Sequence, residues 1–321
     1  MAGRAPSAFG AQNKLVAAAG VRHKARMLVI DAHVHLYPAE VARDPAGWAA
    51  ARAETHWAAL CTRRRRPAVG GESRVQLFPT VAELLRDMDA AGIGKSVLLG
   101  WYWERAETCA WQNRFYAQCV RAHPDRLAAF ATFHPAAGAA ALDEIRRARD
   151  DGLIGLGELS PHSQQVRLDD SVWRAALHLA GELGMPVNLH VTDPGSNSYP
   201  GRMDTPLEDF LEMARDHAGT TFILSHWGGG LAFDPASRHL GNVHFDSSAS
   251  PLLYGSEAWG RAVAGAGADR LLFGSDHPLR LYPKTEAGVG LPAFVEEARS
   301  ALADRDFVRI LGGNARSLFG M

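Results

Sequence analysis

The sequence predicts an α/β protein whose strands close into a distorted (β/α)8 TIM barrel, with a long insertion after the first strand. Two observations support this prediction. Short runs rich in leucine and β-branched residues alternate with amphipathic helical stretches from about residue 28 to the end of the chain. The glycine-rich turn that marks an open, doubly wound sheet does not follow the first run, so an open sheet is the less favoured alternative.

Each predicted strand is a short apolar run, and a helical stretch follows it. The strands are predicted at residues 28–35, 95–100, 126–133, 153–158, 186–191, 221–226, 242–246 and 270–276. The helices are predicted at residues 80–92, 109–123, 139–150, 169–184, 206–218, 256–267 and 291–302, with a closing helix at 304–320. Several begin after Pro, Ser, Thr or Asp and end at Gly, the residues that favour helix caps.

Two segments differ from this alternation. Residues 1–26 are small, basic and aperiodic, and we expect them to be disordered or to extend upstream of the natural start. Residues 27–321 are expected to form one domain. Residues 36–78 are too long for a plain loop and hold Trp48 and Trp57, so we expect them to fold over the barrel mouth. Their run Arg63–Arg66 is interpreted as a solvated face.

Charge and composition exclude several classes of partner. Lys and Arg number 34 against 35 Asp and Glu, a formal charge of −1, which gives no electrostatic reason to expect nucleic acid or an anionic membrane. No run reaches the roughly 18 consecutive apolar residues of a membrane span. Cys61, Cys109 and Cys119 lack zinc-type spacing and indicate free thiols, so a cytoplasmic protein is expected.

The stretch VIDAHVHLYP, residues 29–38, contains His33 and His35 directly after an apolar run. Side chains two apart on a strand share a face, so both imidazoles can reach one point in the barrel lumen. A single histidine at a strand end is usually a hydrogen-bonded structural residue. The H-x-H spacing after a strand instead favours a pair of metal ligands.

Four further polar residues end predicted strands, and such ends meet in one cup at the mouth of a barrel. They are Glu158, His190, His226 and Asp276. Burying unpaired polar groups costs roughly a few kcal/mol each, whereas imidazole and carboxylate are natural ligands of divalent metals. The sequence therefore predicts a metal centre. His226 could instead be an acid or base beside it, and Glu158 could bridge two ions or only support a ligand histidine.

Eight pieces of the chain carry a family resemblance: IDAHVHLYP, LLRDMDAAGI, HPDRLAAFATFHP, GLGELS, MPVNLH, ILSHWGGG, LLFGSDHP and ILGGNARSLFG. With them the chain resembles the amidohydrolase superfamily, specifically the amidohydrolase-2 family that includes the aminocarboxymuconate-semialdehyde decarboxylase-like enzymes. The resemblance implies one or two divalent metals, usually zinc, and often a homodimer. It implies His33, His35, His190 and Asp276 as ligands of the one-metal form, and His226 as the strand-six histidine.

Glu158 departs from the decarboxylase pattern, which generally has no strand-four ligand. TatD-like hydrolases carry a metal-bridging carboxylate at this position, and other branches carry a carboxylated lysine, which this strand lacks. The resemblance therefore favours a two-metal site with Glu158 as the bridge. One ion would be held by His33, His35 and Asp276, and the other by His190 and His226.

Three functions are compatible with these residues. In a metal-dependent hydrolase, the metal lowers the pKa of its bound water from about 15.7 to about 7. Asp276 then takes the proton, and the metal or His226 polarises an amide, ester, lactone or phosphoester. The alternative is a metal-dependent non-oxidative decarboxylase, in which His226 or Asp276 moves a proton and Arg280 holds the acid. A catalytically inactive metal-binding barrel ranks last because the ligand set is intact.

The substrate is expected to be a small organic molecule, cyclic or aromatic in character. Residues expected to line the mouth are Tyr37, Trp101, Trp103, His134, His162, Asp193, Trp227, His277 and Arg280. Half of the aromatic ones are expected to pack in the core instead, and His162 could cap its loop. Zinc is the default for a histidine-rich site, but manganese or iron would fit as well.

Overall fold

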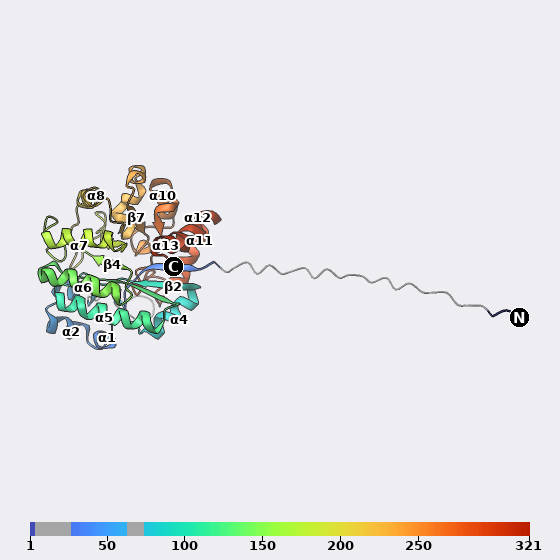
Figure 1. Ribbon diagram of the computed structural model, residues 1–321, viewed down its shortest axis with the longest axis horizontal. Coiled ribbons are helices and arrows are strands. Elements are labelled where there is room, and N and C mark those ends of the chain that lie inside the picture. Colours follow the sequence, from blue (N-terminus) through green and yellow to red (C-terminus); the bar gives the residue numbers. More distant parts are fainter. Residues whose placement is uncertain (4–26, 63–73) are drawn as a thin grey trace.

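The structure, a computed structural model, describes residues 1–3, 27–62 and 74–321 (Figure 1). The predicted N-terminal extension, apart from its first three residues, lies outside the described residues, as does the run Arg63–Arg66. Among the described residues, no helix is both long and apolar enough to cross a membrane.

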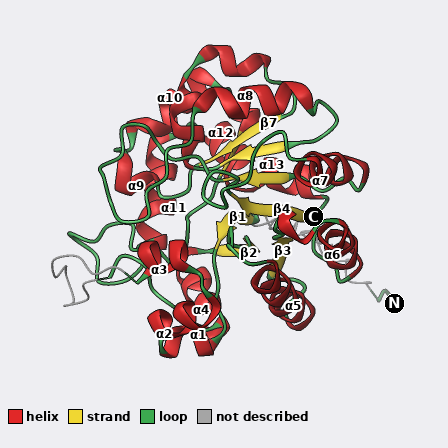
Figure 2. Ribbon diagram, turned by 90° about the vertical axis from the view of Figure 1, so that its left-hand side faces the viewer, coloured by secondary structure: helices red, strands yellow, loops and turns green. Residues whose placement is uncertain are grey.

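Eight parallel strands lie in the order β1 to β8, each paired with the next along the chain. They are β1 (Val29–Val34), β2 (Ile93–Leu98), β3 (Leu127–Ala131), β4 (Gly155–Leu159), β5 (Val187–Leu189), β6 (Phe222–Leu224), β7 (Val243–Asp246) and β8 (Leu271–Leu272). The ends of the order also meet, because the Ala32 amide donates to the Phe273 carbonyl at 2.8 Å. The sheet is thus a nearly closed barrel, which confirms the predicted fold class (Figure 2).

Helices surround the strands (Figure 2). They are α1 (Ala39–Arg43), α2 (Pro45–Arg52), α3 (Thr55–Cys61), α4 (Val81–Ala91), α5 (Ala106–Ala122), α6 (Ala139–Asp150), α7 (Ser171–Glu182), α8 (Leu207–Asp216), α9 (Ser250–Leu253), α10 (Glu257–Gly265), α11 (Leu291–Ala301), α12 (Asp304–Val308) and α13 (Asn314–Phe319). Short 3₁₀ segments are η1 (Pro135–Ala137), η2 (His226–Phe233), η3 (Pro235–His239) and η4 (Ala268–Arg270). The closing helix predicted at 304–320 is interrupted by the π-helical turn η5 (Arg309–Gly313).

Local signals explain where the helices begin and end. Thr80 starts α4 with a capping box: its hydroxyl accepts from the Glu83 amide, and the Glu83 carboxylate accepts from the Thr80 amide. Gly92 ends the same helix with φ 71°, a left-handed conformation that glycine adopts without a steric penalty. Asp170 caps α7 by accepting from the Val172 and Trp173 amides, each at 2.9 Å.

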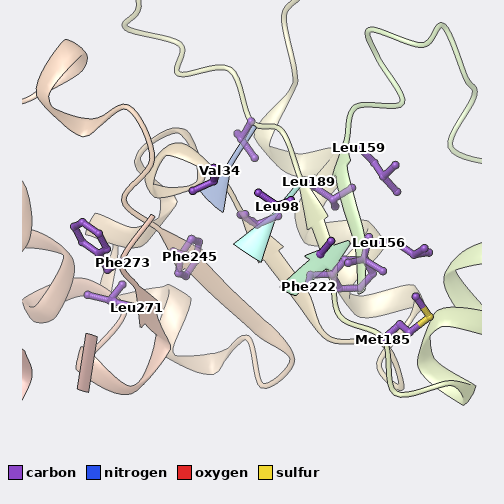
Figure 3. Packing of buried hydrophobic residues seen from close by; sticks show 14 of the residues in the cluster. Val34, Leu98, Leu156, Leu159, Met185, Leu189, Phe222, Phe245, Leu271 and Phe273 are labelled. Carbon is purple, nitrogen blue, oxygen red and sulfur yellow. The ribbon is translucent and has the colours of Figure 1, made fainter. Parts of the chain in front are cut away.

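Two apolar clusters hold the barrel together. The larger one packs strand residues such as Leu98, Leu189 and Phe245 among the elements around them (Figure 3). A smaller cluster joins residues of β1, β2, β3, β6 and β8, including Val97 and Ile223. Because β2 and β6 lie on opposite sides of an eight-stranded barrel, this cluster must cross its lumen. Apolar packing therefore fills the interior, and polar side chains are left at the strand ends.

The long connection after β1 is folded in its described part, residues 36–62 and 74–78. It contains α1, α2 and α3, and its aromatic residues join the segment after β2 in one buried cluster around Tyr37, Trp48, Trp57, Trp101 and Trp103. Trp48 lies 5.3 Å from Trp103, and Trp57 lies 5.5 Å from Tyr37, between ring centroids. The described part of the insertion therefore packs against the segment that follows β2, and its position over the barrel mouth stays a prediction.

Candidate metal centre

Six side chains from the carboxyl ends of the strands converge over the barrel. Their potential ligand atoms form two groups, and within each group they lie within 4.8 Å of one another. The first group is His33, His35 and Asp276, and the second is Glu158, His190 and His226. The structure thus brings together all six predicted ligands. Its groups match the two ligand sets that the resemblance implies, with Glu158, the expected bridge, falling in the second; that they bind metal stays a prediction.

The first group is compact and almost sealed from solvent. The Nε2 atoms of His33 and His35 lie 3.2 Å apart. The Asp276 Oδ1 atom lies 3.7 Å from the first of these nitrogens and 3.5 Å from the second. The exposed fraction is 0% for His33, 2% for His35 and 7% for Asp276. These distances let three donor atoms reach one cation after small side-chain adjustments.

Glu158 belongs to the second group but faces both. Its Oε1 atom lies 3.0 Å from His190 Nδ1 and 3.6 Å from His226 Nε2. Its Oε2 atom lies 3.6 Å from His35 Nε2 and 4.0 Å from His33 Nε2. One carboxylate therefore points one oxygen at each group.

Hydrogen bonds outside the centre determine which imidazole nitrogen is free to bind a cation. His35 Nδ1 lies 3.1 Å from the Leu99 carbonyl, and His226 Nδ1 lies 3.0 Å from the Ser248 carbonyl. A carbonyl oxygen only accepts, so both Nδ1 atoms carry the proton and both Nε2 atoms are lone-pair donors. His33 Nδ1 donates likewise to the Asp246 carboxylate at 2.9 Å. In the neutral form of these rings, three lone pairs face the centre.

This donor set fits a divalent metal. If both rings were neutral, the lone pairs of His33 Nε2 and His35 Nε2 would face each other at 3.2 Å in a buried site, so a positive charge, either a proton or a metal cation, belongs between them. Imidazole nitrogen and carboxylate oxygen are also the ligands that zinc, manganese and iron accept. The chemistry of the six residues therefore supports a divalent metal as the cofactor, without identifying which one.

Comparison with known proteins agrees with this geometry. Residues 30–321 match the profile of a family described as Amidohydrolase. The chain belongs to the amidohydrolase family. It is an enzyme of that superfamily, as the resemblance predicted. No curated protein compared with the chain matches it.

Solved structures with the same fold include two kinds of decarboxylase. A 2,6-dihydroxybenzoate decarboxylase in complex with 2,6-dihydroxybenzoate is 22% identical, covers 92% of this chain and 100% of its own, and has a TM-score of 0.62. The 5-carboxyvanillate decarboxylase of Sphingomonas paucimobilis is 18% identical, with 92% and 99% covered and a TM-score of 0.67.

A second 5-carboxyvanillate decarboxylase, from Novosphingobium aromaticivorans, was solved with manganese and 4-hydroxy-3-methoxy-5-nitrobenzoic acid. It is 16% identical, covers 92% of this chain and 97% of its own, and has a TM-score of 0.68. At these identities the likeness to all three structures establishes the fold. Zinc, the predicted default, stays a prediction for this chain.

The electrostatics of this amidohydrolase centre favour bound positive charge. Burial disfavours a charged His33, yet Asp246, followed by Glu158 and Asp276, raises the pKa of His33 to about 10. Burial raises the pKa of the Glu158 carboxyl, but His190, His226 and His33 together hold it well below its usual range. The carboxylates thus create a negative potential at the centre. Bound protons compensate it in the metal-free protein, and metal cations would compensate it in the loaded enzyme.

Asp246, at the end of β7, is a supporting residue that the sequence analysis missed. Besides His33 Nδ1, its carboxylate accepts from Asn188 Nδ2 at 3.1 Å and from the Ser248 amide at 3.0 Å. It is fully buried, and His33 helps to keep its pKa low despite that burial. Its position at a strand end was a usable signal, because the predicted strand 242–246 ends on this aspartate.

Two strands, β6 and β8, stop before their ligands, and the backbone at each of these ligands is left-handed. His226 has φ 57° and Asp276 has φ 66°, left-handed conformations that cannot continue a strand. The predicted strands 221–226 and 270–276 end earlier than expected, at Leu224 and Leu272, and neither extends through its ligand. Such conformations in non-glycine residues persist where surrounding contacts enforce them, commonly at functional sites.

A pocket opens over both groups of this amidohydrolase. Its floor includes His35, Glu158, His190, His226 and Asp276. Polar wall residues are His56, Tyr102, Ser163, Thr192, Asp193, Ser196, Asn197 and Tyr199. Apolar wall residues include Leu60, Val75, Trp101, Leu252 and Leu279. The insertion contributes His56, Leu60 and Val75, so it shapes the mouth of the site.

Of the residues predicted to line the mouth, only Trp101 and Asp193 are among the described residues that line the pocket. Tyr37 and Trp103 are buried in the aromatic cluster of the insertion. Trp227 packs against Trp259 at 5.2 Å between ring centroids, and its indole donates to the Ser250 hydroxyl.

The remaining predicted residues have structural partners elsewhere. His162 Nε2 pairs with Asp209 at 2.8 Å, and His277 Nε2 pairs with Asp87 at 3.1 Å. His134 Nδ1 accepts from the Ala136 amide, a capping role. Arg280 is fully buried, and one guanidinium nitrogen donates to the Glu286 carbonyl at 2.8 Å. Sequence reasoning missed His56 and Tyr102, which line the pocket and carry no motif.

Proposed function

We propose that this amidohydrolase is a metal-dependent hydrolase that uses two divalent ions to cleave an amide, ester, lactone or phosphoester bond in a small organic substrate. The observation that carries the proposal is the position of Glu158, with one oxygen toward each ligand group. A buried carboxylate between two histidine groups is the natural bridge of a two-metal site. A one-metal site would leave one of the groups without a cation.

The residues have distinct roles in this proposal. When bound, the metal ions supply a water molecule of lowered pKa and neutralise charge that develops on the substrate. Asp276 lines the pocket and is the base that accepts the proton of that water. His226 is a ligand rather than an acid or base, because its Nδ1 proton is committed to the Ser248 carbonyl.

The pocket supports a small organic substrate with both apolar and polar groups. Leu60, Leu252 and Leu279 offer an apolar surface, while Ser163, Thr192 and Asn197 offer hydroxyl and amide groups. Trp101 contributes a flat aromatic wall next to His35, at 5.3 Å between ring centroids. These walls favour a molecule with a ring or branched apolar part and a few hydrogen-bonding groups.

Non-oxidative decarboxylation is the second candidate, and the comparisons favour it over hydrolysis. The three structures described above are decarboxylases of substituted benzoates or vanillates, one of them solved with manganese. The geometry of this chain supports it less. Arg280, the predicted holder of a substrate carboxylate, is buried, bonds the Glu286 carbonyl, and does not line the pocket.

Metal content and reaction products distinguish the two candidates. Purified protein reconstituted with manganese or zinc is expected to bind two ions per chain and to hydrolyse a chromogenic ester, lactone, amide or phosphoester. Glu158→Gln is expected to lower the metal content toward one ion and to remove hydrolysis. Glu208→Gln, which alters an exposed carboxylate paired with Arg215, is the matched control. One ion per chain with CO₂ release from 2,6-dihydroxybenzoate or 5-carboxyvanillate would establish the decarboxylase instead.

A further inference from the structure

Tyr102 lies in the segment that follows β2, between two tryptophans anchored to the same side chain. The Trp101 amide and the Trp103 indole both donate to Gln112 Oε1, at 2.7 Å and 2.6 Å. Gln112 is itself fully buried in α5. The backbone on both sides of Tyr102 is therefore fixed, and its side chain lines the pocket.

The ring of Tyr102 is held next to the metal centre. It stacks on Trp101 at 4.4 Å between centroids, with an interplanar angle of 26°. It lies 5.2 Å from the His190 ring and 5.6 Å from the His56 ring. Only 2% of the residue is exposed. A ring clamped on three sides has little rotational freedom, so its hydroxyl is pre-organised.

The hydroxyl of Tyr102 has no hydrogen-bond partner among the described residues, unlike several other phenols of the chain. Tyr116 donates to the Leu99 carbonyl at 2.8 Å, and Tyr282 donates to Glu297 at 2.8 Å. The Tyr102 pKa is raised by burial and then by Glu158, Tyr199, Cys61 and Asp276. The phenol therefore keeps its proton at neutral pH, and its ring lies beside the His190 ring of the second ligand group.

We propose that Tyr102 is a catalytic residue of this site: its O–H donates a hydrogen bond to the substrate oxygen that gains negative charge when the nucleophile adds to the carbonyl or phosphoryl group. The inference rests on the proposed hydrolase function and adds a residue to it. No proton is transferred from the phenol in this role. Preorganised donors directed at such an oxygen stabilise the transition state more than the substrate.

Tyr102→Phe removes the donor and keeps the ring, so it tests the role without opening a cavity. In metal-loaded protein we expect kcat to fall by about 10²–10³-fold, with KM changed less than about threefold, on whichever chromogenic substrate the wild type cleaves. Metal content and melting temperature should match the wild type. Tyr282→Phe, which removes a phenol hydroxyl outside the pocket, should leave kcat unchanged.

A second readout is independent of turnover. Inorganic phosphate, a small oxyanion, is titrated calorimetrically into the metal-loaded proteins, and Tyr102→Phe is expected to weaken its affinity about 10-fold or more. Equal affinities in wild type and Tyr102→Phe, or no phosphate binding to the wild type, would overturn the role of Tyr102. If the wild type hydrolyses nothing, the proposed function fails, while the phosphate comparison still decides for or against Tyr102.

Discussion

The Nε2 atoms of His33 and His35 face each other at 3.2 Å in a site where neither residue is more than 2% exposed. Asp246 and the Leu99 carbonyl hold the opposite ring nitrogens as donors. Both facing atoms would carry lone pairs if the rings were neutral. The raised pKa of His33, about 10, places a proton between them, and a metal cation would take the place of that proton. This relationship explains why an apolar strand ends in two alternating histidines.

The support that Asp246 gives to His33 leads to the first prediction. Asp246→Asn keeps the shape but loses the carboxylate charge that fixes the His33 tautomer. Metal affinity is expected to fall about 10- to 100-fold, as it does when other outer hydrogen-bond partners of ligand histidines are removed. Competition with a chromophoric chelator measures the change.

Asp209→Asn is the matched control for this experiment. Asp209 also pairs with a histidine, His162, at 2.8 Å, but outside the metal centre. Its substitution should leave metal affinity within about twofold of the wild type. Equal affinities for Asp246→Asn and the wild type would refute the supporting role of Asp246.

The second prediction separates binding from chemistry at Asp276. Asp276→Asn keeps an oxygen 3.5–3.7 Å from the two imidazole nitrogens but removes the base. We expect the variant to keep most of its metal and to lose turnover by at least about 10²–10⁴-fold, the usual contribution of a general base. Metal analysis and steady-state kinetics on the same preparation check both parts. Undiminished turnover would remove Asp276 from the mechanism.

Strand periodicity explains why the centre could be predicted and the pocket walls could not. His33 and Glu158 lie at the ends of apolar runs, and the barrel topology brings such ends together. Beyond the end of a strand, the apolar residues of the chain follow no regular spacing that would show which side chains face the pocket. Trp101 and Trp103 were therefore both predicted to line the mouth, and Tyr102 was not. In the structure Trp101 and Tyr102 line the pocket, while the Trp103 indole is bonded to Gln112 in α5.

Long-range pairing accounts for the other predicted residues. His162 and His277 were candidates because each follows a predicted strand end, His162 four residues after Glu158 and His277 directly after Asp276. Their partners Asp209 and Asp87 lie 47 and 190 positions away in the chain, so no local pattern reveals the pairing. Arg280 likewise follows a predicted strand, but its side chain is fully buried and donates a hydrogen bond to the Glu286 carbonyl.

The third prediction concerns acid stability and His244 in β7. Burial, followed by the charge of Arg270, lowers the pKa of His244 to about 4 in the folded protein, from 6.5. The unfolded chain therefore binds a proton at pH values where the folded chain does not. Stability from this residue is complete above about pH 6.5 and is lost as the pH falls toward 4, by up to roughly 3 kcal/mol.

His244→Gln removes this titration and should flatten the fall in stability over that pH range. Urea denaturation at pH 7, 5.5 and 4.5 measures the difference between variant and wild type. His178→Gln alters a histidine paired with Glu182 on the exposed face of α7 and serves as the control. An identical acid dependence in His244→Gln and the wild type would contradict the prediction.

The fourth prediction compares two glycines that differ in the space around them. A Cβ at Gly312, in the π-helical turn η5, would overlap the carbonyl oxygen of Leu28 at the start of β1. Because the obstacle is backbone, it cannot rotate aside, and Gly312→Ala is expected to destabilise the protein by about 1–3 kcal/mol. Gly260 lies in α10, and no atom lies within 4 Å of the position that an added methyl group would occupy, so Gly260→Ala is expected to stabilise by about 0.4–1 kcal/mol. Denaturation midpoints should therefore move in opposite directions. If both variants were stabilised, helix propensity alone would determine the effect of alanine, and the close approach of η5 to β1 would not be what requires glycine at position 312.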